Sequence, residues 1–209
     1  MAPAVATQAK PSAHARELHE SAIIIDGMNN SRMTGEYFDK LRRAGITCTM
    51  HPVAISTPFR QAIRQLCDFL NLVDQNRDKV LIVRKAEDVL QAKREGKVGI
   101  VMVLEDTRQI EDDIDLIRIF HELGIRRMQH NYTTQNRVSC GKGDRPGHDS
   151  GLSAFGVRVV QPLGLLDERE RARIQGADGG AHLVEARAGR AHDDGHRGRR
   201  HDAGRRQPP

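Results

Sequence analysis

The stretch Val98-Gly-Ile-Val-Met-Val-Leu-Glu-Asp106 decides how this chain folds. Its first seven positions, 98–104, are nearly all apolar. A short run of this kind, without alternating polar residues, is typical of a parallel strand that is buried on both faces. Because Glu105 follows directly, the sequence predicts a carboxylate at the carboxyl end of a buried strand.

The sequence on either side alternates between strand and helix patterns. The expected strands are 23–25, 46–50, 80–83, 98–104 and 126–130. The expected helices are 36–44, a longer one opening at Thr57-Pro58, 86–95, and one carrying Ile114, Ile117, Phe120 and Leu123. The acids Glu111, Asp112 and Asp113 are expected in the first turn of that last helix, where they would complement its dipole. Strand–helix units with short connections predict a parallel α/β fold.

Candidate functional residues lie where the expected strands end, because parallel α/β folds gather their sites at that edge of the sheet. Glu105 is placed to hold a cation or to act in acid–base chemistry, although a solvated strand end explains it equally simply. His130 could contact a substrate, or could be an ordinary exposed histidine. Asp26 could serve only to form a turn before Gly27.

Composition narrows the class of protein. The chain has 209 residues and three cysteines, with a formal net charge of +5. Cys48, Cys67 and Cys140 show no pairing motif, which favours reduced thiols and a cytoplasmic location. The polar N-terminus lacks the apolar stretch of a signal peptide, and no apolar run reaches membrane-spanning length, so no membrane partner is expected.

The last forty residues differ in character from the rest. From Arg171 to Pro209 the chain has no Lys, Ser, Thr, Asn or aromatic residue, and it repeats Arg, Gly, Ala, Asp and His. We expect a flexible N-terminus over 1–16, an α/β segment over 17–166 and a low-complexity tail over 167–209. A shifted reading frame in GC-rich DNA would produce such a tail. Nucleic-acid binding through its Arg/Gly content is a second alternative function, disfavoured because no aromatic residue is present for base stacking.

The strand ends and neighbouring motifs together resemble the membrane (renal) dipeptidase family of zinc hydrolases over about residues 17–160. The matching stretches are Ile25-Asp26-Gly27, 99–105, Ile110-Glu-Asp-Asp113, Phe120-His-Glu-Leu-Gly124, His130-Asn131 and Gly151-Leu-Ser-Ala-Phe-Gly156. The resemblance implies a (β/α)8 barrel in which two zinc ions activate a water that attacks the peptide bond of a dipeptide.

The resemblance also assigns site residues, with two departures. Glu105 falls at the position of the family's bridging metal-binding glutamate, and His130 at that of its substrate-facing histidine. The family's first metal ligands, a His-x-Asp pair, are replaced here by Met28 and Asn30. A thioether is a poor zinc ligand and an amide lacks the negative charge, so we expect one metal position to be weakened or lost.

The family's later metal-binding histidines, substrate-binding arginine and catalytic aspartate have no match in this sequence. We therefore expect a partial TIM-like barrel of the first four or five βα units. Its expected function is zinc-dependent hydrolysis of dipeptides or related small amides, impaired in this truncated chain. The alternative is a catalytically silent binding protein or remnant. An open strand edge also favours association into homo-oligomers.

Overall fold

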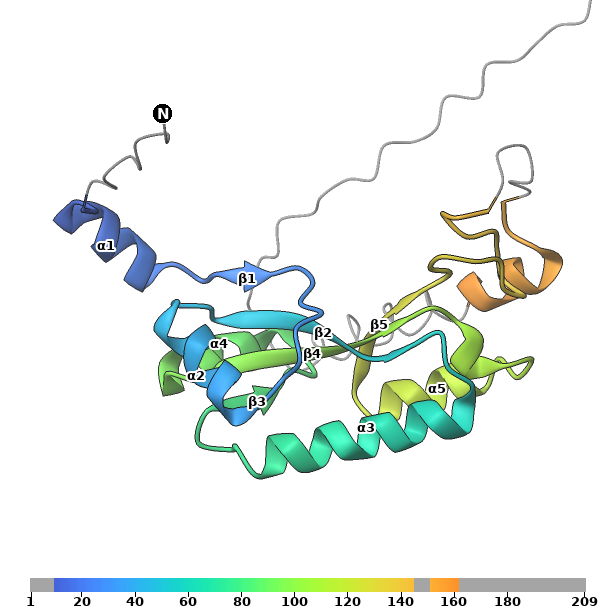
Figure 1. The fold of residues 1–209 in the computed structure, drawn as a ribbon, viewed down its shortest axis with the longest axis horizontal. Coiled ribbons are helices and arrows are strands. Elements are labelled where there is room, and N and C mark those ends of the chain that lie inside the picture. The colour runs from blue at the N-terminus through green and yellow to red at the C-terminus, as the bar shows by residue number, and fades with distance from the viewer. Residues whose placement is uncertain (1–9, 145–150, 162–209) are drawn as a thin grey trace, which may run out of the picture. The chain divides into compact units, whose positions relative to one another are not determined.

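A computed structural model describes residues 10–144 and 151–161 of the chain (Figure 1), and all of them belong to one compact unit, Met1–Arg169. The predicted tail, 167–209, lies outside the described residues. So do the first nine residues of the segment that was expected to be flexible.

Five parallel strands form one sheet, which confirms the predicted α/β class. The strands are β1 (Ile25–Asp26), β2 (Cys48–Ile55), β3 (Val80–Ile82), β4 (Val98–Glu105) and β5 (Ile125–Gln129). Their order is β1-β2-β4-β3, and β5 also pairs with β4. β3 lies beside the first residues of β4, and β5 lies along the rest of the same edge. Among the strands of the described residues, the three-residue β3 is therefore the one that lies out of chain order.

Helices alternate with the strands along the chain, as predicted. They are α1 (Ala13–Ser21), α2 (Gly35–Arg43), α3 (Phe59–Asp74), α4 (Ala86–Glu95) and α5 (Leu116–Glu122), with a 3₁₀ turn, η1 (Arg108–Ile110). α4 has the predicted limits, because Gly96 ends it with φ of 64°, a left-handed conformation that suits glycine. The N-terminal helix α1 was not predicted. It buries none of its residues, so its sequence carries no core-facing apolar pattern.

One prediction about helix ends is wrong. Glu111, Asp112 and Asp113 do not lie in the first turn of a helix, because η1 ends at Ile110 and α5 begins only at Leu116. Between them Glu111 adopts φ of 51°, so the chain turns away from the helical path. The three acids therefore lie in a connecting turn rather than at a helix dipole.

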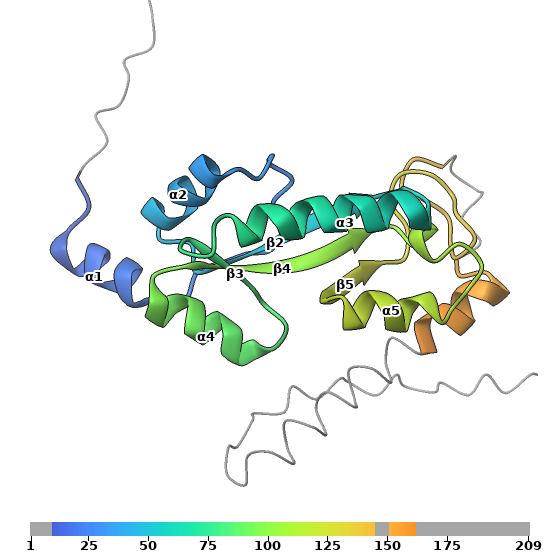
Figure 2. The ribbon, with the colours of Figure 1, turned by 90° about the horizontal axis from the view of Figure 1, so that it is seen from below.

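β4 occupies the middle of the sheet and is covered on both faces. Figure 2 shows α2 and α3 on one side of the sheet and α4 on the other. Ile100, Met102 and Leu104 are at most 1 % exposed and join the core that includes α2 and α3. On the opposite face, a Cβ at Gly99 would lie 2.7 Å from the Val83 side chain and 3.6 Å from Ala92 of α4. This double burial is the physical reason for the unbroken apolar run.

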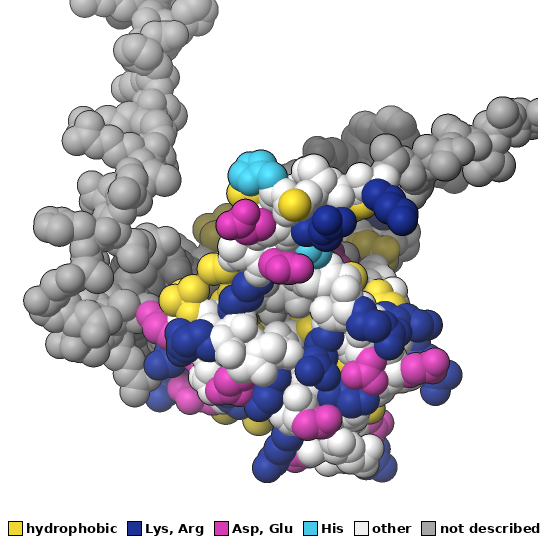
Figure 3. All heavy atoms as spheres, turned by 90° about the vertical axis from the view of Figure 1, so that its left-hand side faces the viewer, with side chains coloured by type: hydrophobic (Ala, Val, Ile, Leu, Met, Phe, Trp, Pro, Cys, Tyr) yellow, Lys and Arg dark blue, Asp and Glu magenta, His cyan; other side chains and the backbone are white. Residues whose placement is uncertain are grey.

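One face of the molecule shows how its charges are distributed. On the face in Figure 3, basic and acidic side chains are interspersed rather than segregated. No helix in the described part of the chain is long and apolar enough to cross a membrane. The nucleic-acid alternative rested on the tail, so these residues do not test it.

Candidate functional site at the carboxyl end of the sheet

Glu105 is the last residue of β4 and lies between two strands. It is paired in register with Ile55 of β2 and with Gln129 of β5, and only 5 % of its surface is exposed. Its Oε2 atom is buried and has no hydrogen-bond partner among the described residues. A buried carboxylate oxygen without a partner is costly unless a cation or donor compensates it. Glu105 is therefore a buried acid that lacks a hydrogen-bond or cation partner for one of its oxygens among the described residues.

Asp106, the next residue, differs from Glu105 because both of its carboxylate oxygens have hydrogen-bond partners. It is fully buried, and its carboxylate accepts hydrogen bonds from the Ser56 hydroxyl at 2.8 Å and from the Arg108 guanidinium at 2.6 Å. It also accepts from the backbone N–H of Thr107 at 2.7 Å and from the side-chain amide of Asn136. Its φ of 110° is unusual for a residue other than glycine and turns the chain sharply at the end of β4. Asp106 thus fastens the ends of β2 and β4 to the loop after β5.

His130 directly follows β5, as the sequence predicted for a residue at a strand end. Its carbonyl accepts hydrogen bonds from the Thr107 hydroxyl and from the Asn136 amide, both at 2.8 Å. The residue itself is exposed. The structure therefore fixes the main chain at His130 and leaves the imidazole accessible to a ligand.

A second buried oxygen lies in the loop that follows. Asn131 is 9 % exposed, and its amide N–H groups donate to the carbonyls of Thr134 and Ser139. Its Oδ1 has no partner among the residues that the structure describes. The carboxyl ends of β4 and β5 thus each have one unpartnered acceptor close by.

The loop after β1 is closed by its own hydrogen bonds. The Asp26 carboxylate accepts from the Met28 backbone N–H at 3.3 Å, the Asn29 amide at 2.9 Å and the Thr49 hydroxyl at 3.2 Å. Asp26 therefore forms a turn, which was the simpler interpretation of its position. Of the two residues that stand at the ligand positions implied by the resemblance, Met28 is half-buried and Asn30 is exposed.

A buried histidine anchors the same loop. His51 of β2 lies with its Nδ1 2.9 Å from the Asn29 carbonyl, and its ring packs against Phe69 with centroids 5.0 Å apart. Burial lowers the pKa of His51 from its ordinary value of 6.5, although the Asn29 carbonyl acts in the opposite direction. His51 is consequently neutral at physiological pH and serves packing and loop placement.

The sheet register keeps the two strand ends apart. Asp26 is level with Thr49 and Ile100, five positions before Glu105 on β4. Five residues of strand span about 16 Å. Within residues 10–144 and 151–161, no three His, Cys, Asp or Glu side chains lie close enough to hold a metal ion. The unpartnered Glu105 oxygen suits a cation, but the described residues do not complete a metal centre.

Some parts of this site could not be found from sequence. Glu105 and His130 were identified from the ends of apolar runs. Asn136 was not, although its side chain bonds to Asp106, to Thr107 and to the His130 carbonyl. These contacts join residues up to thirty positions apart, so no local sequence pattern predicts them.

Comparison with known proteins gives a consistent result. Residues 12–166 match the model of the family described as membrane dipeptidase (peptidase family M19). The dipeptidase tcpJ of Claviceps purpurea is 27 % identical over 127 residues, which are 57 % of this chain and 30 % of that protein. A crystal structure of an amidohydrolase from Pseudomonas aeruginosa has a TM-score of 0.70 and 32 % identity, covering 72 % of this chain and 46 % of the other.

A second solved structure shares the fold at lower identity. The probable dipeptidase PvdM from Pseudomonas aeruginosa has a TM-score of 0.64 and 21 % identity, covering 73 % of this chain and 47 % of the other. The chain thus spans under a third of the curated relative and about half of the solved structures. Over that span it has part of the TIM-like α/β fold of these dipeptidases. With its family match covering residues 12–166, the chain belongs to the membrane dipeptidase family, peptidase family M19.

Proposed function

We propose that this protein acts in the metal-dependent hydrolysis of dipeptides or related small amides, with Glu105 as a zinc ligand and His130 as a substrate contact. The observation that carries the proposal is the buried, unpartnered Oε2 of Glu105 at the end of β4. Two solved structures with a similar fold are described as metallopeptidases: one is assigned to family M19, and the other was crystallised with a phosphinate mimic of a dipeptide.

The contacts around His130 support its part in the proposal. Thr107 and Asn136 hold its carbonyl, so the imidazole projects from a fixed main chain rather than from a free loop. A fixed backbone reduces the entropy lost when a side chain binds a ligand. Glu105 is a single donor, and residues 10–144 and 151–161 place no cluster of three His, Cys, Asp or Glu side chains that would complete a metal site.

A cytoplasmic location is part of the same proposal. Cys48 and Cys67 are free thiols, and Cys48 is buried, where burial raises the pKa of its thiol to about 11. Free thiols are the usual state in a reducing compartment.

A catalytically silent, ligand-binding member of the family is the second candidate. Met28 and Asn30 favour it, because they stand where the family has a His-x-Asp metal pair. The Asp26 carboxylate already accepts hydrogen bonds from Met28, Asn29 and Thr49, so it is a poor replacement for the missing pair.

Zinc content separates the two candidates. The full chain is purified with zinc, dialysed and measured by mass spectrometry beside Glu105→Gln and the exposed-acid control Glu36→Gln. We expect bound zinc in the wild type and the control and its loss in Glu105→Gln. Zinc retained by Glu105→Gln would contradict the assigned ligand.

Activity is then measured on the zinc-loaded chain with a simple dipeptide such as Ala-Ala. The double variant Met28→His/Asn30→Asp restores the family's donor pair. We expect it to bind additional zinc and to hydrolyse the dipeptide faster than the wild type. No zinc and no hydrolysis in any variant would establish the silent candidate instead.

A further inference from the structure

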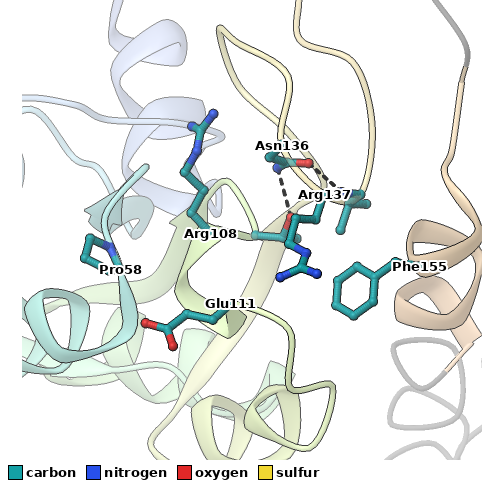
Figure 4. Close-up of a pocket in the computed structure, with 8 residues that line it drawn as sticks. Pro58, Arg108, Glu111, Asn136, Arg137 and Phe155 are labelled. Carbon is teal, nitrogen blue, oxygen red and sulfur yellow. Dashed lines mark hydrogen bonds between the residues drawn. The ribbon is translucent and has the colours of Figure 1, made fainter.

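A pocket of about 280 Å³ lies beside the carboxyl ends of β4 and β5 (Figure 4). Neither Glu105 nor His130 lines it. Its lining residues are Pro58, Thr107, Arg108, Glu111, Asn136, Arg137, Val138 and Phe155. The volume is just below the usual range of ligand pockets, which begins at about 300 Å³, so it suits a small molecule.

The lining is mainly apolar with charged groups at its rim. Val138 is 1 % exposed, and Phe155 and Pro58 contribute the other apolar walls. Figure 4 shows the Arg137 guanidinium facing the Phe155 ring, and the distance from its carbon to the ring centroid is 5.9 Å. Glu111 lies across from them, near Pro58.

The two arginines of the pocket differ in how their charge is used. The Arg108 guanidinium binds Asp106, the carbonyls of Thr134 and Gln135, and the Thr134 hydroxyl, so it is committed to the fold. Arg137 pairs with Asp112 at 3.4 Å, and both side chains are about two-thirds exposed or more. Exposed pairs of this kind contribute little, so Arg137 remains available for an anion.

Glu111 supplies the opposite charge from an unusual backbone. Its φ of 51° is held between η1 and α5, and its Oε1 accepts the Phe59 N–H at the start of α3, at 3.2 Å. Residues held in such conformations occur at ligand clamps, where the surrounding structure maintains them. One backbone N–H leaves most of the acceptor capacity of the carboxylate free.

We propose that this pocket binds a free amino acid with an apolar side chain. The carboxylate of the ligand pairs with Arg137, its ammonium group with Glu111, and its side chain packs on Phe155 and Val138. A cation and an anion on the rim of one apolar pocket match a zwitterion and disfavour ligands that carry either charge alone. The site is additional to the one proposed around Glu105, because Glu105 does not line this pocket.

The probe is L-leucine, titrated into the full chain by calorimetry. Leucinamide, which lacks the carboxylate, and N-acetyl-leucine, which lacks the ammonium group, are the matched ligands. We expect leucine to bind about tenfold more tightly than either, since each loses one charged hydrogen bond. Equal affinity for all three compounds, or no binding of leucine up to its solubility limit, would overturn the proposal.

Variants assign the two charges separately. Arg137→Gln should weaken leucine about tenfold and remove its advantage over leucinamide, while Glu111→Gln should remove its advantage over N-acetyl-leucine. The glutamine keeps an oxygen for the Phe59 N–H, so the local fold is preserved. Arg118→Gln, an exposed arginine of α5 outside the pocket lining, controls for net charge and should bind as the wild type does. Unchanged leucine affinity in both pocket variants contradicts the site.

Glu105→Gln distinguishes this proposal from the hydrolase proposal. It should lose zinc and still bind leucine normally, because Glu105 does not line the pocket. If Glu105→Gln abolishes leucine binding, the amino acid is bound at the Glu105 site and the separate pocket is refuted. If zinc is never bound but leucine titrates as expected, only the hydrolase proposal fails.

Discussion

The ends of β1 and β4 both carry acids, yet these acids are used in different ways. At the end of β1, the Asp26 carboxylate is satisfied by three donors within its own neighbourhood, Met28, Asn29 and Thr49. At the end of β4, Asp106 is likewise satisfied, while Oε2 of the adjacent Glu105 has no partner among the described residues. An acid whose oxygens are all occupied holds the fold together. An acid with a buried oxygen to spare is available for a ligand.

The largest expected effect tests the structural half of this comparison. Asp106→Asn keeps the shape of the side chain but removes the charge that compensates Arg108 and the acceptor for Ser56. We expect a loss of about 3 kcal/mol in the free energy of unfolding, the lower end for breaking a buried ion pair. Urea denaturation of the wild type and the variant measures it.

A matched control uses an ion pair of the same kind at the surface. Arg77 and Asp74 are 2.9 Å apart, with side chains 76 % and 60 % exposed. Asp74→Asn should change stability by less than about 1 kcal/mol. Equal effects of the two substitutions would show that Asp106 does not fasten the strand ends.

Asp26→Ala tests whether the β1 end is structural as well. The substitution removes the acceptor of the buried Thr49 hydroxyl and one of the two acceptors of the buried Asn29 amide, which keeps its bond to the Tyr37 hydroxyl. We expect a destabilisation of about 2 kcal/mol by urea denaturation. Zinc content should not change, since Asp26 is satisfied locally. Loss of zinc in this variant would show that Asp26 is a metal ligand, and would contradict the purely structural role that distinguishes it from Glu105.

These two strand ends also show which features of the fold and the site could be predicted from the sequence. The apolar run 98–104 predicted a parallel strand buried on both faces, because such a run suits double burial, and Gly96 marked the end of α4, where it adopts a left-handed conformation. The positions of Glu105 and His130 followed from the same strand ends. The fold class and the helices with buried faces were therefore predictable from local patterns.

What the sequence did not predict depends on distant pairing. Asp106 and Ser56 are fifty positions apart, and only the bent backbone at Asp106 brings them together. The placement of β3 beside β4 rather than between β2 and β4 is a property of the assembled sheet. The left-handed conformation of Glu111 overrode a local preference for acids at a helix start. Each is decided by tertiary contacts that residue type alone does not specify.

A smaller, pH-dependent effect concerns the anchor of the β1 loop. Burial lowers the pKa of His51 below its ordinary 6.5 in the folded state. As the pH falls through 6.5, the unfolded chain therefore binds a proton that the folded chain resists. The contribution of His51 to stability should be complete above this pH and decline below it, down to the folded-state pKa. Unfolding free energies measured across that range for the wild type and His51→Gln test this. If both proteins show the same pH dependence, the buried histidine is not its source.

The smallest expected effect on stability separates Glu105 from its neighbour. Glu105→Gln makes the same chemical change as Asp106→Asn, one residue earlier in the chain, in a protein stripped of metal by a chelator. Because the Oε2 of Glu105 has no partner to lose, and because a neutral amide is easier to bury than a carboxylate, we expect stability to change by less than about 1 kcal/mol, in the direction of higher stability. Urea denaturation of the metal-free proteins measures this difference. A loss as large as that of Asp106→Asn would mean that Glu105 is held by a partner in the folded chain. Its free oxygen would then no longer argue for a ligand.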